Sequence, residues 1–210
     1  MEKLYLDIDD TLLDTEKYLR LLLKNNFISC PENSSVYELR GDVMAGCIVE
    51  EMLSPEGYEV IPFVNGGEDG IELLKSEYEV VLVSDVVTSD EGVGKTNLAK
   101  RLGCDIILTG KVTGRSKSDI DMSDGVFVDN MPSNLFASNA KRRILMFSEY
   151  DLCYPSERQC FSRMLREDSV TVIGDFYDLV DLLIGVDESD AELRERVYQG
   201  IQKFCKNSGI

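Results

Sequence analysis

The sequence predicts an α/β fold: a doubly wound, Rossmann-like parallel sheet with a small helical cap inserted after the first strand. Two observations lead to this prediction. Short apolar runs that end in turn or acidic residues recur along the 210-residue chain, and segments of helical period lie between them. The first two runs are separated by residues 15–76, which is far more than a crossover of about a dozen residues needs.

The apolar runs read as buried parallel strands, because strands covered on both faces are almost continuously apolar. Between them, Gly70–Glu77 and Gly94–Leu102 have helical period. In such a sheet ligands bind outside the carboxyl ends of the strands, and Asp7, Ser84 and Asp129 all lie just past strand ends. The predicted strands are Leu4–Leu6, Val80–Val83, Ile106–Leu108, Val126–Val128, Ile144–Phe147 and Val170–Ile173.

Residues 15–76 are predicted to form the helical cap. Tyr18–Leu23 and Val43–Met52 are helical in period, whereas Cys30–Ser35 and Leu53–Gly57 read as loops. This pattern of short helices and loops is typical of a small module that folds over one edge of a sheet.

The core is expected to consist of residues 1–14 and 77–210. Its last segment, from Asp187 onward, is first acidic and then amphipathic, with apolar residues at helical spacing. We therefore expect a C-terminal helix packed on the core, and we assign it no chemistry. The apolar positions are Leu193, Val197, Ile201 and Phe204.

Composition excludes several classes of function. A net charge of −17 argues against a nucleic-acid polymer or an anionic membrane as partner, and a small anionic substrate would need a metal or Lys for compensation. The chain has no histidine, which excludes Ser-His-Asp and Cys-His catalysis and His-ligated metals. The six cysteines form no C-x-x-C pair and read as reduced thiols rather than a disulfide framework. The sequence shows no secretory pattern and no apolar stretch of ~18 residues. We therefore expect a cytoplasmic protein.

Three acids, Asp7, Asp9 and Asp10, follow the first predicted strand within four positions. Carboxylates this close repel and raise one another's pKa values, and a bound Mg²⁺, which prefers oxygen ligands, would compensate them. From the residues alone a second interpretation stays open, in which the acids begin a helix, where carboxylates are favoured.

The pattern D-I-D-D-T-L-L at residues 7–13, directly after an apolar strand, resembles the first motif of the haloacid dehalogenase (HAD) superfamily, D-x-D-x-T/V. The resemblance implies that Asp7 attacks phosphorus to form an aspartyl-phosphate, and that Asp9 protonates the leaving group and then activates water. Thr11 would tighten the turn that holds both. Mg²⁺ on Asp7, Asp9 and Asp129 would offset the repulsion between carboxylate and phosphate.

The superfamily's second and third motifs are a hydroxyl after a strand and a Lys that neutralises nucleophile and phosphate. Ser84 follows an apolar strand and would hydrogen-bond a phosphoryl oxygen. For the Lys we prefer Lys117, with Lys111 second and Lys95 also a candidate. Taken singly, Ser84 could be an ordinary turn residue and each Lys a solvated side chain.

The superfamily's last motif is an acid at the end of a further strand. Asp129 closes the run Val126–Val128, which would place its carboxylate on Mg²⁺. Many relatives carry two acids here, and Asn130 departs from that pattern, which could weaken metal binding by removing a charge. Asp124 is a nearby acid that could assist.

A second motif suggests a phosphate-binding P-loop and is rejected. Gly92–Thr96 reads G-V-G-K-T, but position 89 is Ser where the P-loop template requires Gly. Asp90 and Glu91 would also oppose a triphosphate. We therefore assign this segment to the start of the helix that follows Ser84.

Among phosphatases of the superfamily, the chain most resembles the 5'(3')-deoxyribonucleotidase family. The resemblance rests on the order of the motifs and on the cap between the first and second of them. It also rests on four segments: Pro55–Tyr58 and Ile61–Gly67 before the return to the core, Val93–Lys95 after Ser84, and Asp129–Asn134 after the fourth strand. It implies a Mg²⁺-dependent phosphatase acting on a nucleoside monophosphate. Tyr58 or Phe63 in the cap would then stack on the base.

Two alternatives remain open. The same core would serve a phosphatase for a sugar phosphate or another small monoester. A catalytically quiet nucleotide- or metal-binding module is conceivable because of Asn130 and the unassigned Lys, although Asp7 and Asp9 argue against it. A dehalogenase would need neither Asp9 nor the metal as a phosphatase does. Whether the chain forms a homodimer is left open.

Overall fold

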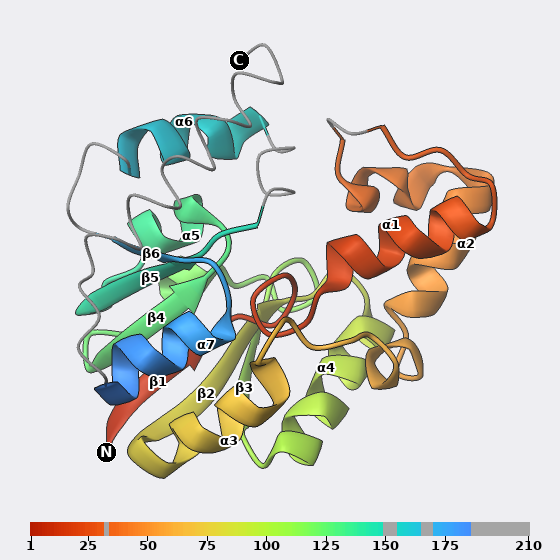
Figure 1. The fold of residues 1–210 in the computed structure, drawn as a ribbon. Coiled ribbons are helices and arrows are strands. Elements are labelled where there is room, and N and C mark those ends of the chain that lie inside the picture. The colour runs from red at the N-terminus through yellow and green to blue at the C-terminus, as the bar shows by residue number, and fades with distance from the viewer. Residues whose placement is uncertain (32–33, 149–154, 165–169, 186–210) are drawn as a thin grey trace.

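The core of the protein is a parallel sheet whose six strands run in the order β3-β2-β1-β4-β5-β6 (Figure 1). The computed structural model describes residues 1–31, 34–148, 155–164 and 170–185. The chain begins near the centre of the sheet and winds outward in both directions, which confirms the predicted doubly wound α/β fold. The strands are β1 Glu2–Leu6, β2 Tyr78–Asp85, β3 Asp105–Thr109, β4 Gly125–Asp129, β5 Arg142–Met146 and β6 Thr171–Ile173.

Helices cover both faces of the sheet. On one face α3 and α4 pack against β2 and β3, and α7 packs on α3; on the other, α5 packs against β4, β5 and α6. Because successive side chains of a strand point to opposite faces, Leu4 and Leu6 of β1 enter the first core and Tyr5 the second. These helices are α3 Gly67–Glu77, α4 Ser89–Leu102, α5 Pro132–Ala137, α6 Pro155–Met164 and α7 Phe176–Val180, and a π-helical turn, η5, follows at Asp181–Gly185.

In the ranges that the structure describes, no helix has both the length and the apolar character needed to cross a bilayer. The predicted C-terminal helix from Asp187 onward lies outside these ranges.

The cap consists of α1 and α2 and two short 3-10 helices, and in Figure 1 α1 and α2 lie to one side of the sheet. The predicted cap, residues 15–76, also included α3, which packs against β2 and α7 instead. Ile71 and Leu74 of α3 are fully buried in the core, so the chain returns to the sheet earlier than predicted. The cap elements are α1 Thr15–Asn25, η1 Val36–Gly41, α2 Val43–Met52 and η2 Gly57–Glu59.

The role of α3 in the core gives a prediction with a control in the same helix. Leu74 is fully buried, so Leu74→Ala should lower the free energy of unfolding by about 2–5 kcal/mol. Its neighbour Leu73 is 53% exposed, and Leu73→Ala should change stability by no more than about 0.5 kcal/mol. Urea unfolding of both variants checks this, and equal losses would show that α3 does not face the sheet.

Candidate active site

The carboxyl ends of β1, β2 and β4 meet below a cavity of about 340 Å³. Leu6 of β1 pairs in register with Leu82 of β2 and Val128 of β4. Asp7 and Asp129, each one residue further along, therefore lie side by side, and the Asp7 amide donates to the Val128 carbonyl at 3.0 Å. The strand ends thus bring these two carboxylates together.

Lys117 joins the two carboxylates. Its Nζ lies 2.7 Å from Asp7 Oδ1 and 2.7 Å from Asp129 Oδ2, and all three side chains are buried. Lys117 begins the 3-10 helix η3, Lys117–Asp119, which Ser116 and Asp119 fix through a capping box. Burying a charge is costly unless it is paired, so this ammonium compensates carboxylates that would otherwise repel each other.

The pKa values of these groups reflect the crowding. Burial raises the pKa of Asp7 to about 7, since the neighbouring charges of Asp129 and Asp9 add to burial and Lys117 only partly opposes them. For Lys117, burial by itself would lower the pKa, but Asp129 and Asp7 outweigh burial and raise it. The ammonium therefore stays charged, and the site holds more carboxylate than it has cation to balance.

Asp129 is held by two further donors. The Met131 amide donates to its Oδ1 at 2.7 Å, and Asn134 Nδ2, in the first turn of α5, donates to its Oδ2 at 3.1 Å. These bonds fix the carboxylate against Lys117. Asn134 was not predicted as a site residue, although it ends the segment Asp129–Asn134 that resembles the nucleotidase family, and that resemblance could have indicated its role.

The loop after β1 is a tight turn. The amides of Leu12 and Leu13 both donate to the Ile8 carbonyl at 2.9 Å, and Asp10 has a positive φ of 58°. Thr11, expected to tighten this turn, is fully buried, but among the described residues its hydroxyl has no hydrogen-bond partner. Backbone hydrogen bonds therefore hold the turn.

Asp9 is held by a second buried lysine. Lys95 Nζ lies 2.7 Å from Asp9 Oδ2, while the hydroxyl of Thr15 donates to Oδ1 at 2.9 Å and that of Tyr58 at 3.2 Å. Burial would lower the pKa of Lys95, but the charges of Asp9 and Glu91 outweigh it and raise the pKa. From the sequence Lys95 was a candidate for the phosphate-binding Lys, in a segment assigned to a helix start, and its pairing with Asp9 was not predicted.

The structure brings most of the predicted site residues together. Asp7, Asp9, Ser84 and Lys117 line the cavity, and Asp129, which does not line it, pairs with Lys117. Lys111, the second choice for the phosphate-binding Lys, is exposed and does not line the cavity.

Three other expectations differ from the structure. Asp124 is at the opposite end of β4, where it binds Lys3 and the Tyr5 hydroxyl, so it cannot assist the site. Tyr58 is buried and donates its hydroxyl to Asp9, and neither Tyr58 nor Phe63 lines the cavity where a base would stack. The cap residues that line it are Tyr37 and Arg40.

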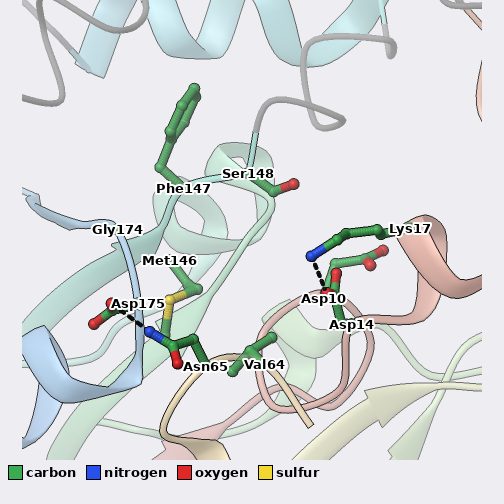
Figure 2. Close-up of a pocket in the computed structure, with 10 residues that line it drawn as sticks. All are labelled: Asp10, Asp14, Lys17, Val64, Asn65, Met146, Phe147, Ser148, Gly174 and Asp175. Atoms are coloured by element: carbon green, nitrogen blue, oxygen red, sulfur yellow. Dashed lines mark hydrogen bonds and ion pairs between the residues drawn. The ribbon is translucent and has the colours of Figure 1, made fainter. Parts of the chain in front are cut away.

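A second cavity, of about 280 Å³, shares Asp10 with the first (Figure 2). In Figure 2 Lys17 pairs with Asp14 at 2.9 Å, and Asn65 donates to Asp175 at 3.1 Å. Four of its polar side chains thus bind one another in pairs, and we assign this cavity no chemistry.

The side chains fit a Mg²⁺ site only in part. Within the described ranges no group of three His, Cys, Asp or Glu side chains is placed to hold a metal. Of the predicted ligands Asp7, Asp9 and Asp129, the first and last lie together at Lys117, whereas Asp9 pairs with Lys95 instead. Asp7 and Asp129 lie close enough together to share the Lys117 ammonium. Mg²⁺ is usually held by one or two carboxylates together with substrate phosphate. This pair fits such a site.

No family model and no curated protein matches the sequence. Solved structures do resemble it. YfnB of Bacillus subtilis, named as a HAD-hydrolase and bound to magnesium, is 14% identical with a TM-score of 0.53, over 87% of this chain and 98% of its own. A haloacid dehalogenase-like hydrolase of Burkholderia xenovorans LB400 has 14% identity and a TM-score of 0.55, over 87% of this chain and 97% of its own. An L-2-haloacid dehalogenase has 14% identity and a TM-score of 0.56, over 87% of this chain and 99% of its own. The fold is therefore that of HAD-like hydrolases.

The buried pairs of Lys117 give a prediction about stability. Lys117→Met should lower the free energy of unfolding by about 3–5 kcal/mol, because it leaves two buried carboxylates without their counter-charge. The exposed Lys111 provides the control, and Lys111→Met should have an effect within about 0.5 kcal/mol. Urea unfolding in the presence of a chelator measures both, and an unchanged midpoint for Lys117→Met would contradict the pairing.

Proposed function

We propose that the protein is a Mg²⁺-dependent phosphomonoester hydrolase that works through an aspartyl-phosphate on Asp7. One observation carries the proposal. Asp7 is buried at the end of a central strand, beside the Lys117 ammonium and at the floor of a cavity, and Asp9 lines the same cavity two residues later. A nucleophile, a cation and a second carboxylate are the parts that such a reaction needs.

In the first step a carboxylate oxygen of Asp7 attacks phosphorus, and the bond from phosphorus to the leaving oxygen breaks. Asp9, protonated, gives its proton to that oxygen, so the leaving group departs as a neutral alcohol. Lys117 and Ser84 bind phosphoryl oxygens and offset the charge that the substrate brings.

In the second step water attacks the phosphorus of the aspartyl-phosphate. Asp9, now ionised, takes a proton from the water, and the bond between phosphorus and the Asp7 oxygen breaks. Phosphate leaves, Asp7 is again a carboxylate and Asp9 is again protonated, so the cycle closes without any other reactant.

Asp7 and Asp129 are the residues that would hold Mg²⁺, with the adjacent Asn130 contributing an amide in place of a second acid. When bound, the metal supplies charge that reduces the repulsion between the attacking carboxylate and the phosphate. The magnesium in the B. subtilis neighbour supports this part of the proposal.

For the substrate we propose a nucleoside monophosphate, as in the 5'(3')-deoxyribonucleotidases. A cavity of about 340 Å³ is large enough for a small ligand, given that ligand sites span about 300–1,000 Å³. Tyr37 and Arg40 line its cap side, so the base would lie against Tyr37 rather than Tyr58 or Phe63. A sugar phosphate is the alternative, since the same floor would bind its phosphate.

A dehalogenase is the second candidate function, because an L-2-haloacid dehalogenase is among the similar structures. The placement of Asp9 favours the phosphatase. Its carboxylate lines the cavity and is fixed there by Lys95, Thr15 and Tyr58, an arrangement that a dehalogenase would not need.

Phosphate release from a panel of nucleoside and sugar monophosphates tests the proposal. Wild-type protein with Mg²⁺ should release phosphate, and Asp7→Asn should lower turnover by about 10³-fold or more, because the amide is a poor nucleophile. Asp124→Asn, at an exposed carboxylate outside the site, is the control and should be fully active.

The pattern of release separates the alternatives. Selective release from deoxynucleotides supports the nucleotidase, and broad release leaves a phosphatase of another small monoester. Undiminished turnover by Asp7→Asn would contradict the nucleophile, and no release from any substrate would favour a binding module.

The metal gives a separate prediction. Asp129→Asn should raise the Mg²⁺ concentration for half-maximal rate by about 10-fold or more, since even the loss of an outer-shell partner of a metal costs that much. EDTA should silence the wild type, and added Mg²⁺ should restore it. A rate that persists after thorough chelation would exclude the metal from the reaction.

A further inference from the structure

The segment Gly92–Thr96, rejected as a P-loop from the sequence and assigned to a helix, lies inside α4. One of its glycines, Gly94, allows a close contact with the cap. A Cβ on Gly94 would lie 2.6 Å from Tyr58 Cδ2 and 3.1 Å from the Ser54 carbonyl oxygen, so only glycine lets the cap loop approach the helix this closely. This contact brings Tyr58 of the cap and Lys95 of α4 to the same carboxylate, Asp9.

Lys95 has no freedom to move within this cluster. Its side chain is 1% exposed, and its ammonium donates to Asp9 Oδ2, to Glu91 Oε1 at 3.1 Å and to the Asp85 carbonyl. An ammonium has three donors, and here each has an acceptor from a different part of the chain. Lys95 is therefore a fixed partner of Asp9, and it does not line the cavity in which phosphate would bind.

Glu91 anchors Lys95 to the cap. It accepts hydrogen bonds from the Val87 amide at 2.9 Å and from Arg40 Nη2 at 3.3 Å, in addition to that from Lys95. When Asp9 is ionised, its charge and that of Glu91 are balanced by the charges of Lys95 and Arg40. If Lys95 were removed, Glu91 would keep Arg40, whereas Asp9 would keep only the neutral hydroxyls of Thr15 and Tyr58.

We propose that Lys95 is a positioning residue for the acid/base step, which holds the Asp9 carboxylate toward the oxygen that leaves phosphorus. The inference rests on the proposed phosphatase function. Lys95 touches neither phosphate nor metal in this role: Lys117 serves the nucleophile and Lys95 serves the acid/base residue. Each catalytic carboxylate thus has its own buried ammonium.

This role predicts a loss that depends on the leaving group. An alkyl or nucleoside oxygen leaves poorly without a proton, whereas p-nitrophenolate leaves readily as an anion. Lys95→Met should lower kcat/KM for an alkyl or nucleoside monophosphate by about 10–100-fold, part of the 10²–10⁴-fold that general acid catalysis contributes. For p-nitrophenyl phosphate the loss of kcat/KM should stay within about 3-fold, because p-nitrophenolate leaves without a proton and general acid catalysis contributes little to that reaction.

The quantity kcat/KM is chosen because it reports the steps up to the aspartyl-phosphate, so the later action of Asp9 as a base does not enter. Lys100 is an exposed lysine in the same helix, so Lys100→Met is the matched control and should leave kcat/KM unchanged for both substrates. Asp9→Asn should show the same dependence on the leaving group. Adding Lys95→Met to Asp9→Asn should lower kcat/KM little further, because each change removes the same acid function.

Each outcome decides between distinct possibilities. Equal losses on both substrates, or no loss on either, would overturn the role of Lys95 while leaving the phosphatase intact. A wild type inactive on both substrates would instead overturn the proposed function. If Lys95→Met does not fold, Lys95→Gln keeps a neutral donor of similar length in the cluster, and it should show the same dependence with a smaller loss.

Discussion

The bridge that the Lys117 ammonium makes between Asp7 and Asp129 is the interaction on which the geometry of the site depends. Two buried carboxylates at adjacent strand ends would repel, and an ammonium 2.7 Å from each compensates both. The parallel register of β1 and β4 places the acids side by side, and η3 brings the lysine over the strand ends. The proposed attack on a phosphate monoester needs such a nucleophile, fixed in place and next to a cation.

The charges of this chain are unevenly arranged. The net charge is −17, yet the two carboxylates assigned to chemistry each contact a buried lysine. Lys117 lies over the strand ends and Lys95 lies where the cap meets α4, so the first depends on the sheet and the second on the docking of the cap. Of the two lysines only Lys117 lines the cavity, so an anionic substrate would meet its ammonium beside a surplus of carboxylates, which the proposed Mg²⁺ would offset.

The fold followed from the sequence because buried parallel strands are continuously apolar, and the shared edge of their carboxyl ends then brought Asp7, Ser84 and Asp129 together. The cap boundary did not follow, since the amphipathic period of α3 does not reveal which surface it faces. Lys95 was a candidate only for the phosphate-binding Lys, and its pairing with Asp9 did not follow from the sequence for a similar reason. The burial of Lys95 depends on the Asp9 carboxylate and on a cap loop, both far from it in the sequence, and no local sequence pattern predicts such a long-range contact.

The central claim is that Asp7 itself carries the phosphoryl group during turnover. The most direct test is to mix the wild-type protein with a phosphomonoester and Mg²⁺, quench with acid at short times, and analyse the peptide that contains Asp7 by mass spectrometry. The account predicts one phosphoryl group on Asp7, formed before free phosphate accumulates. Release of phosphate with Asp7 unmodified at every time point, or with the phosphoryl group on another residue, would contradict it.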